Sequence, residues 1–152
     1  MKSPIVAAFA LAAASPLAAQ APIADLTYAP PIAGSWSYAA TADGSEARFA
    51  DSANNPQLWI HCTRATRQLS IAKPASAAAP FLNVWTSSMT RSVPSSYNPA
   101  PRRLTIQLVA SDPLLDAIAS SRGRIGFSAG AESPLVLPPW PEATRVIEEC
   151  RA

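Results

Sequence analysis

The chain has 152 residues, a formal net charge of +2 and only 14% charged residues, so one domain is expected and a charge-driven disordered chain is excluded. Sixteen prolines against five glycines exclude the long uninterrupted helices of a coiled coil or helical bundle. No apolar run reaches roughly 18 residues, which excludes a polytopic membrane protein. The near-neutral charge gives no electrostatic reason to expect nucleic acid or anionic lipid as a partner.

The N-terminal segment has the pattern of a secretory signal peptide. Lys2 supplies a positive charge, and residues 5–14 form an apolar stretch that is too short to span a bilayer. Small residues favour cleavage after Ala19, whereas a cut two residues later would leave Pro22 next to the scissile bond. We therefore predict that residues 1–19 are a signal peptide and that the protein is periplasmic or secreted, with no integral membrane segment after cleavage. An uncleaved single-pass anchor is the alternative.

Residues 20–33 contain three prolines and few charges, so we interpret them as an extended Pro-rich arm or linker rather than a packed element. Short segments with the two-residue period of β-strands follow. The clearest spans 57–63, with its apolar side chains on one face and Trp59 and His61 on the other. Proline-rich residues 92–102 are predicted to be mostly loop. The expected strands cover residues 36–40, 47–50, 57–63, 67–72, 81–87, 103–110, 124–128 and 135–137.

Two helices are predicted from their end signals. Asp112 is a suitable N-cap, Pro113 suits the first helical position, and Gly123 is expected to end the helix. Pro141 begins a second helix, in which residues 143, 146, 147 and 150 form one apolar face. The predicted fold is mainly β: a single domain over 34–152, built as a sandwich or partly open barrel of about seven or eight short strands, with two short helices, one of them C-terminal.

The two cysteines, Cys62 and Cys150, are predicted to form a disulfide. An even pair in an exported chain favours a bond, which is worth roughly 4–5 kcal/mol on the chain-entropy model. Cys62 lies on the apolar face of its strand and Cys150 on the apolar face of the second helix, so both point toward the core. Two free thiols are the alternative. One histidine and no C-x-x-C motif predict neither a metal site nor a cofactor.

No catalytic residue is predicted. His61 is the only histidine, and the chain has no G-x-S-x-G motif to accompany it in a triad. We interpret His61 as a half-exposed or hydrogen-bonded strand residue. The tryptophans suit either a core cluster or a surface platform for a peptide, sugar or protein; they are Trp36, Trp59, Trp85 and Trp140. Trp59 and His61 form the candidate binding surface.

After the predicted signal peptide the chain contains, in order, Gly-Ser-Trp at 34–36, P-x-L-x-I-x-C at 56–62 and Cys150. This layout resembles small uncharacterised secreted proteins of Gram-negative bacteria, of the invasion-associated locus B type and the VasI type of type VI secretion accessory proteins. The resemblance covers residues 34–62 and Cys150 and implies no catalytic residues. We expect a non-enzymatic binding or accessory module with a protein, peptide or glycan partner in the envelope. The alternatives are a small secreted hydrolase with an unrecognised site and a structural envelope protein.

Overall fold

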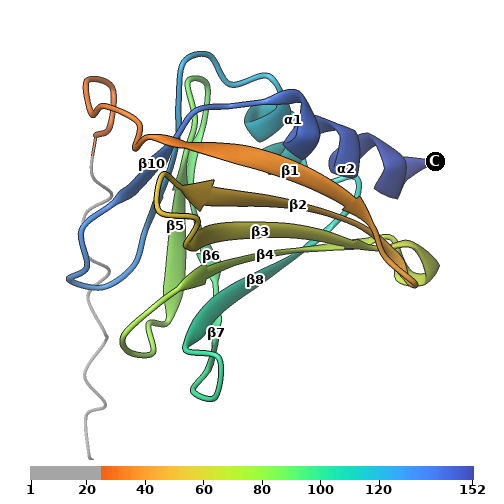
Figure 1. Cartoon of the computed structure of the whole chain (residues 1–152), viewed down its shortest axis with the longest axis horizontal. Helices are drawn as coiled ribbons and strands as arrows, with labels where there is room; N and C mark the ends of the chain where they lie inside the picture. Colours follow the sequence, from red (N-terminus) through yellow and green to blue (C-terminus); the bar gives the residue numbers. More distant parts are fainter. Residues whose placement is uncertain (1–24) are drawn as a thin grey trace, which may run out of the picture.

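The computed structural model describes residues 25–152, so the predicted signal peptide and residues 20–24 lie outside the described residues. Within them the chain forms two antiparallel sheets and two α-helices, which confirms the mainly β class; no closed barrel is present there (Figure 1). The larger sheet has the order β1 (Gly34–Ala40), β2 (Gly44–Asp51), β3 (Pro56–Thr63), β4 (Gln68–Pro74), β8 (Arg103–Val109) and β7 (Ser96–Asn98). The smaller sheet has the order β10 (Leu135–Leu137), β9 (Ile125–Ser128), β5 (Phe81–Trp85) and β6 (Thr90–Pro94).

One apolar core lies on the inner face of the six-stranded sheet. Strands β2, β3, β4 and β8 alternate between buried and accessible residues, as expected where one face is covered. The helix α2 (Pro141–Arg151) packs across one end of this inner face, with α1 (Pro113–Ala119) beside it, and the four-stranded sheet covers the other end (Figure 1). Both sheets and both helices contribute to the same buried cluster, so the opposite, outer face of the large sheet is left to solvent.

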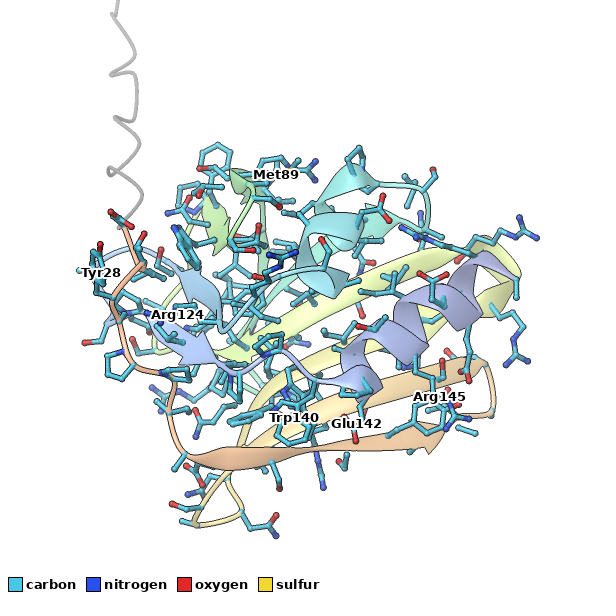
Figure 2. All side chains as sticks on the ribbon, turned by 90° about the horizontal axis from the view of Figure 1, so that it is seen from above. Tyr28, Met89, Arg124, Trp140, Glu142 and Arg145 are labelled. Carbon is cyan, nitrogen blue, oxygen red and sulfur yellow. A yellow bond between two sulfur atoms is a disulfide. The ribbon has the colours of Figure 1, made fainter. Side chains whose placement is uncertain are left out.

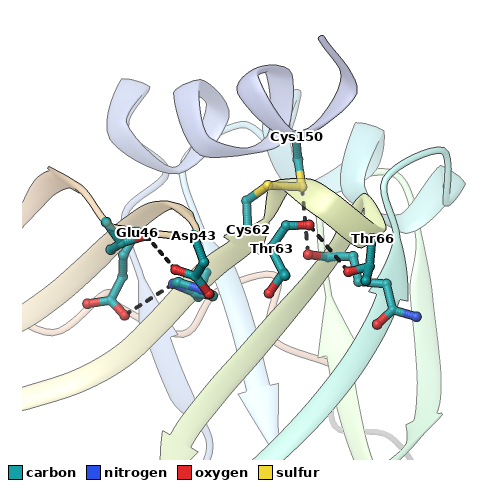
Figure 3. Close-up of polar contacts among 9 residues, drawn as sticks. Asp43, Glu46, Cys62, Thr63, Thr66 and Cys150 are labelled. Carbon is teal, nitrogen blue, oxygen red and sulfur yellow. Dashed lines mark hydrogen bonds and ion pairs between the residues drawn. A yellow bond between two sulfur atoms is a disulfide. The ribbon is translucent and has the colours of Figure 1, made fainter.

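The predicted disulfide is confirmed. Cys62 on β3 and Cys150 on α2 are bonded, with their Cα atoms 5.6 Å apart (Figure 3). Both cysteines are buried, and Val146 and Ile147 on the same side of α2 are fully buried beside them. The helical face read from the sequence is therefore the face that meets the sheet, which is why the two cysteines meet.

The start of α1 agrees with its end signals, but its predicted end is wrong. The carboxylate of Asp112 accepts a hydrogen bond from the Leu114 N–H at 2.8 Å, and Pro113 is the first helical residue. The helix ends at residue 119, and at its C-cap the N–H of Ser120 makes the last helical bond to the Asp116 carbonyl, to which the Ser120 hydroxyl also donates. Gly123, with φ +78°, lies in the following turn and does not terminate the helix.

Two strands occupy the region expected to be mostly loop. Part of β6 and all of β7 lie within residues 92–102, where prolines argued against strands. Pro94 ends β6, and both strands are edges of their sheets, where a missing N–H donor removes no ladder bond. The sequence prediction failed here because proline excludes central strands and not edge strands.

The described part of the Pro-rich arm is mostly exposed, but it is anchored to the domain at Leu26, which the sequence interpretation did not include. Leu26 is 5% exposed, and one nitrogen of Arg124 donates to the carbonyls of Leu26, Thr27 and Ala29. A Cβ atom on Gly126 of β9 would lie 2.1 Å from the Leu26 side chain, so glycine leaves the space that Leu26 occupies. These partners are almost 100 positions away in the sequence, where no local pattern links them to the arm.

Candidate functional site

Trp59 and His61 lie together on the outer face of the large sheet. They are two residues apart on β3, and both are half-buried. The register between β2 and β3 places Arg48 directly opposite Trp59 and Glu46 directly opposite His61. Period-2 alternation was sufficient to place Trp59 and His61 on one face, but the neighbours on β2 depend on a register that the sequence does not specify.

An arginine from β8 completes the group around Trp59. The guanidinium carbon of Arg103 lies 3.6 Å from the centre of the Trp59 ring, in a cation–π contact. On β4 the residue opposite Trp59 is the small Ala72, which leaves room for Arg103 to reach over the sheet. Such a contact is worth about 0.5–1 kcal/mol at a partly exposed site. We call Arg48, Trp59, His61 and Arg103 the outer-face cluster.

His61 lies between two carboxylates. Its Nε2 is 3.1 Å from Oδ2 of Asp43, and its Nδ1 is 3.7 Å from Oε2 of Glu46 (Figure 3). Hydrogen bonds from Thr41 and then from His61 lower the pKa of Asp43. A serine nucleophile needs an imidazole nitrogen that can accept its proton, and here each nitrogen faces a carboxylate. The arrangement therefore suits a charged surface cluster and not a catalytic triad.

The same geometry bears on metal binding. The two carboxylates approach different nitrogens of the His61 ring, so the three side chains do not converge on one point. Across residues 25–152 no three side chains of His, Cys, Asp or Glu are grouped so as to hold a metal ion.

The four tryptophans do not form one core cluster. Trp36 is buried, with its ring edge-on to Phe49 at 5.5 Å between centroids. Trp59 and Trp85 are half-buried on different sheets, and Trp140 is 53% exposed just before α2 (Figure 2). Each tryptophan therefore has its own surroundings, and only Trp59 lies among arginines on an open sheet face.

A buried ion pair lies at the far end of the inner face and was missed from the sequence. Lys73 is 5% exposed, and its Nζ donates to Oε2 of Glu132 at 2.9 Å and to the Pro74 carbonyl at 2.8 Å. The ammonium of Lys73 and then the hydroxyl and N–H of Ser76 lower the pKa of Glu132 to about 2. A carboxylate with so low a pKa is a poor base for Ser76. The missed signal was Lys73 itself, a charge in the inward phase of β4.

A groove with a volume of about 580 Å³ lies at the end of β4 and β8 that is remote from Lys73. Two of its charged groups are paired: Arg151 lies 2.8 Å from Asp116 and 3.3 Å from Glu148, and its Nε donates to the Ala110 carbonyl. A second open groove, of about 540 Å³, lies beside Trp140. The first groove offers a ligand few unsatisfied polar atoms.

No family model, curated protein or solved structure matches this chain. In the part of the chain that the structure describes, neither helix has the length and apolar character needed to cross a membrane.

Proposed function

We propose that the protein is an exported binding or accessory module, periplasmic or secreted, that recognises its partner through the outer-face cluster and catalyses no reaction. One observation carries the proposal: an aromatic ring, two arginines and a histidine share an open sheet face whose opposite side holds the whole core. Trp and Arg are enriched where proteins bind other molecules, because each provides a large contact area with directional polar groups.

The chemistry of the cluster favours a partner that carries carboxylates. The Arg103 guanidinium is stacked on Trp59, and the exposed residue Arg48 lies directly opposite Trp59 in the register of β2 with β3. Guanidinium groups bind carboxylates through paired hydrogen bonds, and an indole ring packs against a sugar ring or a peptide side chain. An acidic peptide segment or an acidic glycan of the envelope satisfies both requirements.

Export is supported by three features. Residues 1–19 have the signal-peptide pattern, the chain carries a disulfide, and the layout of residues 34–62 resembles secreted accessory proteins. Disulfides persist in oxidising compartments and are rare in the cytosol. Mass spectrometry of the native protein tests this part of the proposal: mature material should lack Met1 to Ala19, and an intact Met1 would contradict it.

Charge reversal at Arg48 tests the binding site. Arg48→Glu changes the charge of the outer-face cluster without removing a packed side chain, and Arg122→Glu makes the same change at an exposed position near α1. Titration with acidic peptides and acidic glycans should show binding by the unmodified chain and by Arg122→Glu, with a loss of about tenfold or more in Arg48→Glu. Equal losses in both variants, or in neither, would contradict the assignment.

A further inference from the structure

Each sheet has two edge strands, and the four edges in the described residues differ. β7 and β10 have three residues each. β6 ends in Pro94 and carries Arg91, whose guanidinium is paired with Asp112 at 2.8 Å. β1 has seven residues, with neither charge nor proline. All of its residues are exposed except Trp36 and Tyr38, and it runs along the margin of the molecule in Figure 2.

The outward edge of β1 offers backbone groups for a further strand. β1 pairs with β2 and with no other strand of residues 25–152. A strand paired on one side leaves alternate N–H and C=O groups pointing away from its sheet. Natural proteins usually protect such an edge with short length, proline, charge or a bulge. β7, β10 and β6 each have at least one of these devices, and the regular seven-residue register of β1 has none.

We propose that β1 is a homodimer interface, in which β1 of a second copy of this chain adds antiparallel to it and joins the two large sheets. Self-pairing across a two-fold axis brings two identical strands together, so a strand whose charges have one sign repels its own copy. β1 carries no charge, and the whole chain has a net charge of only +2, so neither short-range nor long-range repulsion opposes the contact.

The residue order of β1 suits this pairing. Full overlap of the seven residues puts Ser37, the central residue, opposite Ser37 of the second copy. On the inner face Trp36 then lies opposite Tyr38 of the second copy, and the reverse pair forms by symmetry, which gives two aromatic cross-strand pairs. On the outer face the residues are Ser35, Ser37 and Ala39, which are small enough to leave the edge accessible.

The strand is already held in the geometry that pairing requires. The Trp36 Nε1 donates to the Pro138 carbonyl at 2.9 Å, and the Tyr38 hydroxyl donates to Glu149 at 2.7 Å. These contacts tie β1 to the start and the end of α2, so little ordering entropy is lost when a second strand docks. Gly34 also fixes the position of β1, since a Cβ there would lie 2.2 Å from the Ala50 carbonyl.

The test is sedimentation of the chain, expressed from its full-length sequence, over a wide concentration range. The unmodified protein should shift from monomer to dimer mass as concentration rises, and β1 amides should exchange more slowly in the dimer. Ser37→Lys places two ammonium groups at the axis and should weaken dimerisation at least tenfold. Ser96→Lys makes the same change on the exposed β7 edge of the same sheet and should leave dimerisation unchanged.

A charge-swap mixture separates repulsion from misfolding. Ser37→Lys and Ser37→Glu should each be weaker dimers alone, and an equimolar mixture should recover a dimer that contains one copy of each. A chain that stays monomeric at every concentration overturns the proposal and leaves the β1 edge to a strand from another protein. Dimerisation that survives Ser37→Lys, or that is lost in Ser96→Lys, overturns it as well.

Discussion

The two ends of the inner face are covered by different means. At one end α2, an 11-residue helix, presents a narrow apolar stripe and is joined to β3 by the Cys62–Cys150 bond. At the other end the four-stranded sheet brings larger side chains, including Leu82, Val84 and Phe127, and no covalent bond. A helix of this length is unstable alone. The comparison teaches that the cover with less apolar area is the one that carries the cross-link.

The two ends of the inner face also differ in where their polar contacts lie. At the α2 end Tyr38 and Arg145 both contact Glu149 near the surface, and the Arg145 guanidinium lies 3.7 Å from the Tyr38 ring centre. At the other end Lys73 is buried against Glu132. Surface ion pairs contribute little, whereas breaking a buried pair leaves a charge without a partner. We therefore expect the stability of the end under the four-stranded sheet to depend on the Lys73–Glu132 pair, and the stability of the α2 end to depend on the disulfide.

Removal of the cross-link should have the largest effect. Cys150→Ser should destabilise the domain by roughly 2–5 kcal/mol, because the unfolded chain regains the entropy of an open loop. Hydrogen exchange should show α2 opening before the sheet, since only non-covalent contacts, chiefly the packing of Val146 and Ile147, then hold it. The measurements are melting temperatures of the oxidised, reduced and Cys150→Ser forms. Equal melting temperatures, or two reactive thiols in the native protein, would contradict this role for the disulfide.

Acid should weaken the end that the four-stranded sheet covers, through Glu132. The pKa of Glu132 is about 2 in the folded chain against an ordinary 4.5, so its contribution is complete above pH 4.5 and is lost as pH falls toward 2. With solvent screening of a side chain that is 31% exposed, we expect a loss of about 2 kcal/mol. Denaturant unfolding at several pH values measures it. Glu132→Gln should remove most of this dependence, and an unchanged acid profile would exclude Glu132 as its source.

Loss of the Tyr38 hydroxyl should have a smaller effect. Tyr38→Phe removes the 2.7 Å hydrogen bond to Glu149 and keeps the ring beneath Arg145. We expect a loss of about 1 kcal/mol, typical of a hydrogen bond to a partly solvated carboxylate that water can replace. Chemical denaturation of the variant and of the unmodified protein measures the difference in their free energies of unfolding. A loss of stability as large as that of Cys150→Ser would contradict our inference that the disulfide is the main contact that stabilises the α2 end.

His61 lies on the outer face of the large sheet, away from both α2 and the four-stranded sheet, and its substitution should change stability least. His61→Gln removes the contact with Asp43 at an exposed site, so we expect a change of about 1 kcal/mol or less. If the protein binds and does not catalyse, the variant should also keep its native phenotype or lose it only in proportion to partner binding. A folded His61→Gln chain with unchanged binding and no biological activity would revive the hydrolase alternative.

Local patterns predicted those parts of the fold that depend on neighbouring residues. The alternation of β3, the N-cap at Asp112 and the apolar face of α2 are periodic or capping signals. The first and the last of these placed Cys62 and Cys150 toward the core, which supported the predicted disulfide. The packing of the arm depends on Arg124 and Gly126, and the strands β6 and β7 depend on their position at sheet edges. Neither the distant contacts of the arm nor the edge positions of these strands can be predicted from neighbouring residues in the sequence.

The candidate site also has one part that the sequence predicts and one part that it does not. Trp59 and His61 share a face because they are two residues apart in a strand. Arg48 and Arg103 join them only through the registers of β2 with β3 and of β4 with β8. The carboxylates beside His61 come from β2 and from the turn that precedes it. The alternation within a strand gives the face of each residue, but it does not give the residue that lies opposite on a strand such as β8, which is distant in the sequence.

The spacing of the two cysteines also sets an order of events during synthesis. Cys62 and Cys150 are 88 positions apart, so β3 emerges from the translation or export machinery long before its covalent partner. Through that interval the Cys62 thiol faces solvent and other thiols, and a mixed disulfide formed then must be exchanged before α2 can dock. In an oxidising compartment the maturation of this small domain therefore depends on thiol–disulfide exchange, in which the Cys150 thiolate attacks the Cys62 sulfur and releases the other thiol. We expect Cys150→Ser, which lacks the attacking thiol, to accumulate mixed disulfides at Cys62.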